Sequence, residues 1–518
     1  MHARESVWRQ IVGPWDVLVI GGGITGAGIA HEAARYGLRA LLVERGDFAC
    51  GTSSRSSKMV HGGLRYLKEG KIGLTRESVR ERERLLREAP GLVEPLSFLA
   101  PHYRARKPGK TLYGIGLAMY DVLGGTWKHR FVDAEEALQL VPGLRHEDLI
   151  GAHVFADATT DDARLVLRVL QEAQDLGALA INYVEVVGLV RDGARVVGAN
   201  LVERVTGARA EIAARVVINA TGASADALRA SVGESPKLRP LRGSHLLVPD
   251  WRLPLAQAVA FSHPRDGRPV FAYPWSGMTL VGTTDIDHRG DLRDEPSITP
   301  DEVAYLVEAL ADVFPDLAIG RPDIVSTFAG VRPVVASGAA DPSRESRDQM
   351  LLEEHGLITI AGGKLTTFRA MATAALRAAL RHLPAAPRNA RSGEALCNAS
   401  LPQATALSPS AQRRLAGRYG AHAQAVVAGA AEDGLTPIGG TETLWAELSY
   451  AATHEAVVHL DDLLLRRTRV GLALPQGGAE FFARIRACTP ALGWDDARWN
   501  EEIAAYRAQW QRHYSVPE

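Results

Sequence analysis

Cysteine is scarce in this sequence: only Cys50, Cys397 and Cys488 occur among 518 residues, and no two of them form a CxxC pair. This scarcity excludes a disulfide framework and a cysteine-rich metal site, and it is typical of a reducing compartment. No histidine pair has metal-ligand spacing either, so no metal is expected. The formal net charge is −1, which gives no electrostatic reason to expect nucleic acid as a partner.

Long apolar runs are missing as well. No stretch reaches the roughly 18 apolar residues that cross a bilayer, and the N-terminal residues 1–14 lack the apolar core of a secretory signal. We therefore expect the protein on the cytoplasmic side of the membrane. Hydrophobic residues make up 46% and charged residues 23% of the chain. This is an ordinary globular balance, and the length predicts two or three domains.

A glycine-rich turn stands out near the N-terminus, where an apolar strand pattern, a tight turn and a helical pattern follow one another. This order is typical of a pyrophosphate site. Gly21 permits the turn, Gly23 lets the backbone approach the phosphates, and Gly26 lets helix and strand pack closely. The next strand pattern, 40–43, ends in Glu44, whose carboxylate can accept the ribose hydroxyls of an adenosine. The pattern predicts a dinucleotide site and leaves NAD and FAD open.

A second strand, glycine turn and helix start occupies residues 357–380, with Gly362 and Gly363 in the turn. A nicotinamide dehydrogenase has no obvious need for it. A flavin does, because reduction places negative charge at N1 and the C2 carbonyl, which a helix N-terminus stabilises. The second turn therefore favours FAD.

Two further segments have both a functional and an ordinary interpretation. Residues 51–66, directly after the ribose-binding strand, are rich in serine and glycine. They could wrap phosphates or the ribityl chain of a flavin, or form a flexible polar loop. The strand 215–220 ends in Thr221 and Gly222, which would let the chain pass beside a nucleotide or simply terminate the strand.

Several basic residues stand beside small turns: Arg65, Arg332, Arg347 and Lys364. Arginine suits the bidentate recognition of a phosphate or carboxylate, although each residue alone is more often a surface charge. Because glycine and proline turns lie beside these residues, we expect their side chains to meet in one pocket. His245 lies in an otherwise apolar strand pattern and is either a satisfied core histidine or a general base.

The order of patterns predicts the α/β class, with a Rossmann-like FAD-binding domain, an antiparallel-sheet substrate (cap) domain and an α-helical C-terminal domain. Within the cap, strands at 270–273 and 278–282 are expected to form a hairpin with a four-residue loop. A single strand is expected over 180–187. The predicted boundaries are 1–80 with 151–230 and 325–382 for the FAD-binding domain, 81–150 and 231–324 for the cap, 383–403 for a linker, and 404–518 for the helical domain.

Taken together, the motifs resemble those of the FAD-dependent glycerol-3-phosphate dehydrogenases of aerobic metabolism. The resemblance covers nearly the whole chain. It departs from the family pattern at Phe368, where a tyrosine is common, and at Met59-Val60, where Leu-Ile is common. The motifs that carry it are residues 16–26, 51–54, 58–67, 242–245, 281–285, 329–333 and 362–369, and in the tail Tyr450, His454-Glu455 and 464–471.

The resemblance implies oxidation of sn-glycerol 3-phosphate at C2 to dihydroxyacetone phosphate, with hydride transfer to flavin N5 and electrons passed to a membrane quinone. It implies catalytic roles for His245, Arg332 and Lys364, with His245 as the base unless the cationic pocket itself lowers the barrier. The substrate pocket is expected to hold Arg65, Tyr66, Thr284, Arg332, Arg347 and Lys364, with Arg332 and Arg347 on the phosphate. The residues expected to bind FAD are Gly21, Gly23, Ile24, Thr25, Gly26, Glu44, Arg45, Thr52, Ser53, Ser54, Ser57, Lys58, His61, Gly62, Val184, Ala220, Thr221, Gly222, Gly363, Lys364, Leu365 and Thr366.

A quinone acceptor requires contact with a membrane, so we expect a peripheral protein on the inner face of the cell membrane. The segment 107–130 is the candidate, because an apolar stretch at 112–123 is bracketed by Lys107, Lys110, Lys128 and Arg130. An internal helix of the cap explains it equally well. A homodimer stays open. The alternatives in function are a soluble glycerol-3-phosphate oxidase that uses O2 and a flavin-binding sensor without turnover.

Overall fold

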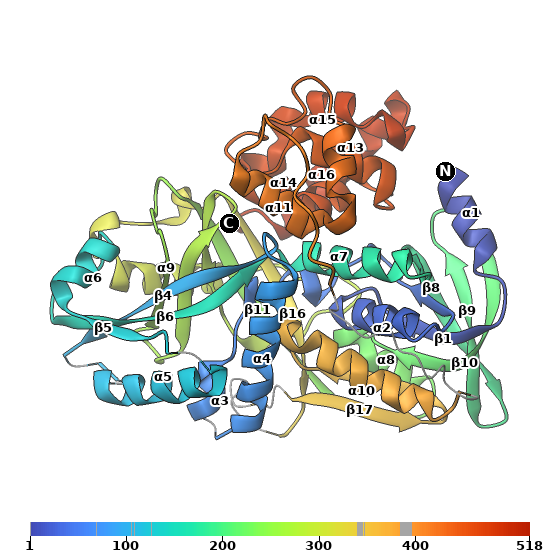
Figure 1. The fold of residues 1–518 in the computed structure, drawn as a ribbon, viewed down its shortest axis with the longest axis horizontal. Helices are drawn as coiled ribbons and strands as arrows, with labels where there is room; N and C mark the ends of the chain where they lie inside the picture. Colours follow the sequence, from blue (N-terminus) through green and yellow to red (C-terminus); the bar gives the residue numbers. More distant parts are fainter. Residues whose placement is uncertain are drawn as a thin grey trace.

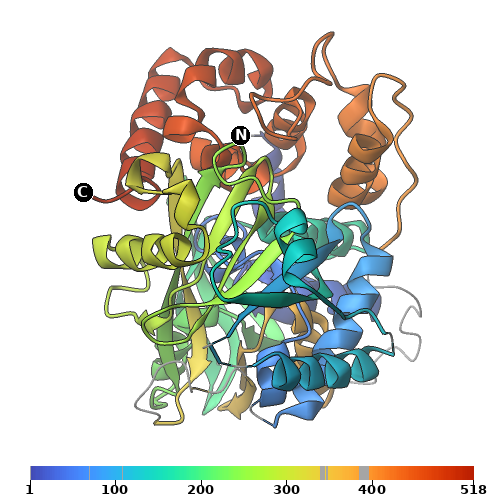
Figure 2. The same cartoon turned by 90° about the vertical axis from the view of Figure 1, so that its left-hand side faces the viewer.

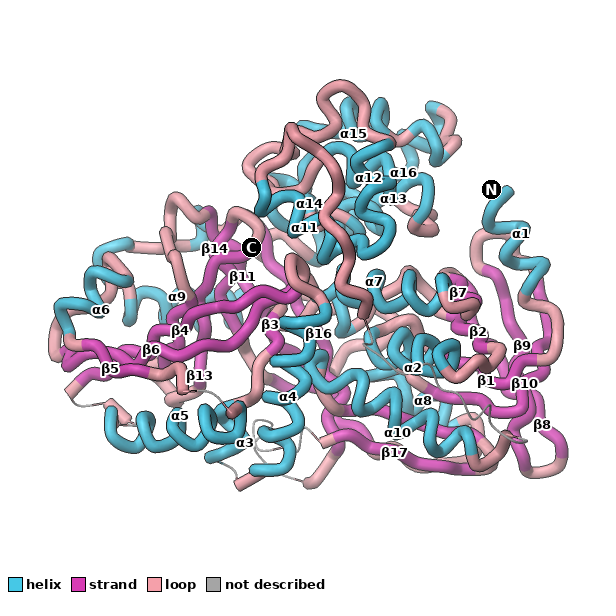
Figure 3. The backbone as a smooth tube through the Cα atoms, in the orientation of Figure 1, coloured by secondary structure: helices cyan, strands magenta, loops and turns pink. Residues whose placement is uncertain are grey.

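Two β-sheets lie side by side and a helical C-terminal region covers their junction (Figure 1). The view turned by 90° and the tube drawing show the same three parts (Figures 2 and 3). The computed structural model describes residues 2–68, 70–104, 106–107, 109–125, 127–338, 345, 348–383 and 396–518.

The first sheet has the strand order β17-β18-β10-β1-β2-β7, and β18, β10, β1, β2 and β7 run parallel. Their carboxyl ends therefore meet at one edge, where α/β sheets bind ligands. A hairpin of β8 and β9 extends β10. The strands are β1 (Trp15–Ile20), β2 (Ala40–Val43), β7 (Leu179–Ile181), β8 (Val184–Asp192), β9 (Arg195–Glu203), β10 (Arg209–Asn219), β17 (Gln349–Glu354) and β18 (Leu357–Gly362).

Both faces of the first sheet are buried, which explains the continuous apolar run of β1. On one face Val17 and Val19 join the core formed with α2 (Ile24–Arg35), α7 (Asp162–Asp175) and α10 (Phe368–Leu380). On the other face Leu18 and Ile20 pack with the β8–β9 hairpin. Two more helices belong to this part of the chain, α1 (His2–Gln10) and α8 (Ala225–Ala230).

The second sheet is curled and mostly antiparallel, in the order β15-β11-β14-β13-β12-β4-β6-β3, with β16 paired to β11 and β5 to β6. The helix α9 (Pro300–Val313) packs on it through a separate apolar core. Its strands are β3 (Met59–Val60), β4 (Val93–Tyr103), β5 (Arg130–Val132), β6 (Leu149–Thr160), β11 (Leu238–Pro249), β12 (Ala258–Ser262), β13 (Pro269–Trp275), β14 (Met278–Gly282), β15 (Ile286–Asp287) and β16 (Ser326–Val335). The neighbouring helices are α3 (Leu64–Lys68), α4 (Ile72–Glu88), α5 (Lys110–Gly124) and α6 (Ala134–Leu140).

The C-terminal region is helical, and it shares an apolar core with the second sheet. Tyr273, Trp275 and Phe328 of the sheet belong to one cluster with Leu464 and Tyr506 of the helices. The helices are α11 (Pro409–Tyr419), α12 (Ala423–Ala428), α13 (Trp445–His454), α14 (Val470–Ala473), α15 (Phe482–Cys488) and α16 (Asp496–His513), with a π-helical segment at Asp462–Arg467.

Two local predictions were wrong. The hairpin loop has two residues rather than four, because β13 continues to Trp275, which pairs with Met278. Ser276 and Gly277 both have positive φ, +50° and +76°, as a type I′ turn requires. The strand expected over 180–187 is divided at Tyr183, where φ is +54°. Apart from these two, the strand β16 lies within residues 325–382, which the predicted boundaries assign to the FAD-binding domain, and it pairs with β11 of the second sheet.

Candidate active site

A cavity of about 2140 Å³ opens between the two sheets. One wall consists of the carboxyl ends of β1, β2, β10 and β18, and the other of residues on β4, β11, β12 and β16. Pockets for single small molecules are typically about 300–1,000 Å³. The cavity therefore has room for a dinucleotide together with a substrate.

The N-terminal glycine turn has the geometry that its spacing predicts. Gly21 has a φ of +114°, and a Cβ there would lie 2.5 Å from the carbonyl oxygen of Ala220. A Cβ on Gly26 would lie 1.9 Å from the carbonyl oxygen of Gly21. The turn therefore passes tightly between β10 and α2, and the N-terminus of α2 faces the cavity as an anion site.

Glu44 and Ser53 fix the chain around this turn. The Glu44 carboxylate accepts hydrogen bonds from the backbone N–H of Gly22 (2.7 Å) and of Gly46 (2.9 Å). Ser53 Oγ accepts one from the N–H of Ile24 at 3.0 Å. The predicted serine-rich loop is thus ordered against the start of α2, as the functional interpretation required.

The second glycine turn also lies on the cavity. Gly362 and Gly363 have φ values of +78° and +66°, and a Cβ on Gly363 would lie 2.3 Å from Met371 Sδ. Lys364 precedes a short 3-10 turn, Leu365–Thr367, which leads into α10. Two glycine turns on one cavity, at the carboxyl ends of β1 and β18, fit FAD.

Most of the residues predicted to bind the cofactor line the cavity, but four do not. Lys58 is fully buried, where its Nζ contacts Asp162 (2.9 Å) and the carbonyl of Ser54 (3.0 Å). Burial and Arg469 lower the pKa of Lys58 to about 8. The residues off the cavity are Gly26, Ser54, Lys58 and Gly62; those on it are Gly21, Gly23, Ile24, Thr25, Glu44, Arg45, Thr52, Ser53, Ser57, His61, Val184, Ala220, Thr221, Gly222, Gly363, Lys364, Leu365 and Thr366.

His245 on β11 lies at the cavity wall and is only 1% exposed. Its Nε2 is 2.9 Å from Ser57 Oγ, and its ring stacks on Phe328 with centroids 4.6 Å apart. Gly282 makes room for the ring, because a Cβ there would lie 2.2 Å from Cδ2. Burial, Arg332 and Lys58 hold the pKa of His245 well below its usual value. The imidazole is therefore neutral at pH 7 and able to accept a proton.

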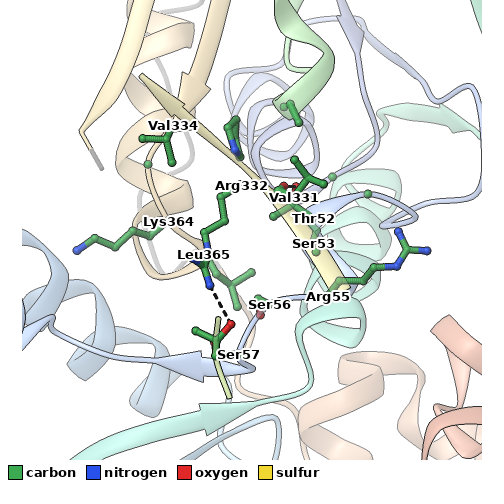
Figure 4. Close-up of a pocket in the computed structure, with 18 of the residues that line it drawn as sticks. Thr52, Ser53, Arg55, Ser56, Ser57, Val331, Arg332, Val334, Lys364 and Leu365 are labelled. Carbon is green, nitrogen blue, oxygen red and sulfur yellow. Dashed lines mark hydrogen bonds between the residues drawn. The ribbon is translucent and has the colours of Figure 1, made fainter. Parts of the chain in front are cut away.

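Arg332 projects from β16 into the same part of the cavity (Figure 4). Its guanidinium is oriented by Asp285, whose Oδ1 lies 2.9 Å from Nη1, and by Thr283 Oγ1, 3.1 Å from Nη2. The absence of a side chain at Gly243 lets it pass, because a Cβ there would lie 2.3 Å from Nη2. Arg268 approaches the other carboxylate oxygen of Asp285 at 3.3 Å. A cationic group of fixed orientation results.

Thr284 does not line the cavity, whereas its neighbour Thr283 does. Thr284 Oγ1 donates to Glu302 (2.6 Å) and accepts from the backbone N–H of Ser244 (2.9 Å). Its hydroxyl is thus engaged inside the second sheet. The predicted segment thus reaches the cavity, but through Thr283 rather than through Thr284.

Lys364 and Tyr66 lie together. The Nζ of Lys364 stands 3.6 Å from the centre of the Tyr66 ring and donates to Ser78 Oγ at 2.8 Å. In Figure 4 the amino group points away from Arg332, so the two cations flank the cavity from different sides. The other two predicted cations cannot be placed in this way: the side chain of Arg65 and the whole of Arg347 lie outside the described residues.

Three residues of the C-terminal region also line the cavity, and no sequence motif pointed to them. They are Asp461, Arg466 and Gln509. Their separation from the glycine turns along the chain hides their proximity in space. The run of charged residues at 461–469 is the sole signal in the sequence.

Comparison with known protein families agrees with this geometry. Residues 16–369 match the model of the FAD dependent oxidoreductases, and residues 389–499 match the C-terminal domain of alpha-glycerophosphate oxidase. The first match spans both sheets and every cavity residue before the C-terminal region. The fold and the cavity therefore define a flavoprotein oxidoreductase with FAD as its cofactor, as predicted.

Individual relatives narrow the assignment from a flavoprotein oxidoreductase to one family. Glycerol-3-phosphate dehydrogenase 2 of Mycobacterium tuberculosis is 37% identical over 98% of this chain and 90% of its own. The aerobic glycerol-3-phosphate dehydrogenase of Staphylococcus saprophyticus is 35% identical over 90% of this chain and 88% of its own. The crystal structure of glycerol-3-phosphate dehydrogenase from Bacillus halodurans complexed with FAD superposes with a TM-score of 0.77 at 28% identity, covering 98% and 97% of the two chains. The chain belongs to the FAD-dependent glycerol-3-phosphate dehydrogenase family.

The buried neutral His245 predicts a loss of stability in acid. The unfolded chain binds a proton at this histidine below about pH 6.5, whereas the folded chain does not, so the contribution of neutral His245 is complete above pH 6.5 and declines as the pH falls. We expect the fall in Tm between pH 7 and pH 5 to be smaller in His245→Gln than in the unmodified protein. The exposed His146 gives the control His146→Gln, which should keep the full fall; an equal fall in all three proteins would contradict the prediction.

Proposed function

We propose that this protein oxidises sn-glycerol 3-phosphate to dihydroxyacetone phosphate with FAD as the hydride acceptor, and that a membrane quinone takes the electrons. The observation that carries the proposal is that one cavity joins two glycine turns to a fixed arginine and a neutral histidine. The relatives at 35–37% identity bear the name glycerol-3-phosphate dehydrogenase, which supports the choice of substrate.

Recognition of the phosphate falls to Arg332. Asp285 and Thr283 hold its guanidinium before substrate arrives, so little side-chain entropy remains to be lost on binding. Lys364, held by Tyr66 and Ser78, supplies a second positive charge beside the second glycine turn. A cation there stabilises the charge that a reduced flavin carries at N1.

His245 removes the proton of the C2 hydroxyl. Because the imidazole is neutral and Nε2 is hydrogen-bonded to Ser57, it can act as a base without first losing a proton. As the O–H bond breaks, a C=O bond forms at C2 and the C2 hydride leaves toward flavin N5, which is the chemistry that bound FAD supplies. Arg332 and burial disfavour the resulting imidazolium, which favours the loss of this proton before the next turnover.

The helix α5 supports contact with a membrane. Leu112, Ile115, Met119 and Val122 form one stripe along it at helical spacing and are 44–70% exposed. Trp127, just beyond the helix, is 69% exposed. Exposed Lys107, Lys110, Lys128 and Arg130 flank the stripe, as in helices that lie in a lipid interface.

The stripe on α5 reaches the mouth of the cavity. Leu112, Ile115 and Met119 are among the cavity-lining residues. An apolar acceptor dissolved in the membrane could therefore enter without crossing water. No helix in the described part of the chain is long and apolar enough to span a bilayer.

The central test is a spectrum of the purified holoprotein without oxygen. Glycerol 3-phosphate should bleach the flavin bands, and a soluble quinone analogue should restore them faster than air-saturated buffer does. Peroxide release under air with no gain from quinone would instead establish the oxidase. A flavin that stays oxidised after mixing would establish the sensor.

Replacing Arg332 should affect substrate binding above all. Arg332→Gln removes a charge-assisted interaction with the phosphate, so we expect kcat/KM for glycerol 3-phosphate to fall by about 10- to 100-fold, chiefly through KM. Steady-state kinetics at saturating acceptor measure this. Arg191→Gln, which changes an exposed arginine on β8, is the control and should behave as the unmodified enzyme. An unaltered KM in Arg332→Gln would refute the phosphate role.

Replacing two residues of the α5 stripe should weaken membrane binding. In Leu112→Ser/Val122→Ser the lost apolar area lowers the affinity for anionic liposomes, by at least about tenfold in a sedimentation assay. Trp251→Ser is the matched control, because Trp251 is 77% exposed on the loop between β11 and β12. Equal loss in both variants would mean that α5 has no special part in membrane contact.

A further inference from the structure

The C-terminal region reaches the cofactor cavity through a buried carboxylate, Asp47. This residue lies in the loop 44–50, which follows the ribose-binding strand β2, and it is 1% exposed. Its Oδ1 accepts from Arg467 (2.7 Å) and from Asn182 Nδ2 (2.9 Å). Its Oδ2 accepts from Arg467 and from Arg466 Nε, both at 2.5 Å. Burial would raise the pKa of Asp47, but Arg467 and Arg466 outweigh it and hold the pKa well below the usual range.

The two arginines are neighbours in the π-helical segment Asp462–Arg467. Arg467 is fully buried and Arg466 is 3% exposed. A buried charge of this kind is tolerated because it is paired and hydrogen-bonded. Arg466 also contacts Asp461 (2.6 Å) and Asp462 (2.5 Å). The segment therefore carries a network of paired charges. Its arginines, Arg466 and Arg467, contact Asp47 of the cofactor-binding half.

The loop 44–50 is tied to the residues that form the cofactor site. Glu44 binds the N–H of Gly22 and of Gly46, and the N–H of Ala49 donates to the carbonyl of Gly22 at 3.0 Å. The loop is therefore joined to the glycine turn at Gly22 by two hydrogen bonds. Asp47 is the position at which this loop is attached to the C-terminal region.

A second connection runs through Tyr183 at the start of β8. Its hydroxyl donates to Asp462 Oδ1 at 2.6 Å, and its backbone N–H donates to the carbonyl of Gly46 at 2.7 Å. Tyr183, Asp47 and Arg466 all line the cavity. The same three residues therefore belong both to the cavity wall and to the charge network.

We propose that the C-terminal helical region retains FAD: Arg466 and Arg467, through Asp47, hold the loop 44–50 in the position that binds the adenosine end. They are positioning residues, which act through the loop. The C-terminal region thereby acquires a function in cofactor affinity in addition to its packing on the second sheet.

The test is the dissociation constant of FAD, measured by titrating apoprotein and following flavin fluorescence. Asp47→Asn weakens the charge-assisted bonds to both arginines, so we expect the Kd of FAD to rise about tenfold or more. Glu455→Gln is the matched control. The Glu455 carboxylate pairs with buried Arg164 of α7 at 2.8 Å, so it likewise links the C-terminal region to the cofactor-binding half, but through Arg164 rather than through the loop 44–50. The backbone carbonyl of Glu455, which accepts from Arg467 Nε at 3.0 Å, is kept in this variant. This variant should lower Tm and leave the Kd within about twofold of that of the unmodified protein.

Milder variants decide the question if Asp47→Asn fails to fold. Tyr183→Phe removes one hydroxyl and should raise the Kd severalfold, and Arg466→Lys should do the same while keeping the charge. If Glu455→Gln raised the Kd of FAD as much as the other variants do, the arginines would act only by stabilising the fold, and the proposal would be overturned. An unaltered Kd in Asp47→Asn, Tyr183→Phe and Arg466→Lys would also overturn it. Because the readout is FAD binding alone, the result is independent of the electron acceptor and of turnover.

Discussion

Buried carboxylates at the junction of the three parts are the constraint on which the rest of the structure depends. Asp47, Asp161 and Asp162 all come from the cofactor-binding half, and each is at most 7% exposed. Each is paired with an arginine of the C-terminal region: Asp47 with Arg467, Asp161 with Arg418 at 3.0 Å, and Asp162 with Arg469 at 2.9 Å. An unpaired charge at this depth would cost several kcal/mol, so the parts dock in one arrangement. Three residues of the docked C-terminal region, Asp461, Arg466 and Gln509, complete the lining of the cavity between the two sheets.

Charge also governs the reacting end of the cavity. Arg332 sits where it attracts an anion, and the same charge, together with burial, keeps His245 unprotonated. In the proposed reaction, one cation thus has two roles: Arg332 binds the phosphate and keeps the base, His245, unprotonated. Lys58 is also cationic, but it is buried and paired with Asp162. From this position its charge helps to lower the pKa of His245. The site is therefore a cluster of positive charge with a neutral imidazole inside it.

Local features of the chain were predicted well from the sequence. The glycine turn, the strand 40–43 and the cofactor FAD follow from short-range spacing, where the physical reason for each residue is local. The fold class and the family follow from the same motifs in combination. The sequence did not show that the hydroxyl of Thr284 lies off the cavity. This position depends on its hydrogen bond to Glu302, which is a tertiary contact. The cavity residues Asp461 and Arg466 likewise result from tertiary docking, which leaves no periodic signal.

The pairing of Asp47 with Arg467 has a consequence for the order in which the protein is made. The two residues are 420 positions apart in the chain. At typical synthesis rates of about 5–20 residues per second, roughly 20 to 80 seconds separate their appearance. During that interval the ribose-binding loop has left the ribosome and its carboxylate has no partner from the C-terminal region. The parallel sheet can form once β18 (Leu357–Gly362) has been made, but the arginine partners of Asp47 are added only with the last quarter of the chain. We therefore expect the retention of FAD that we propose for this pairing to begin only late in synthesis.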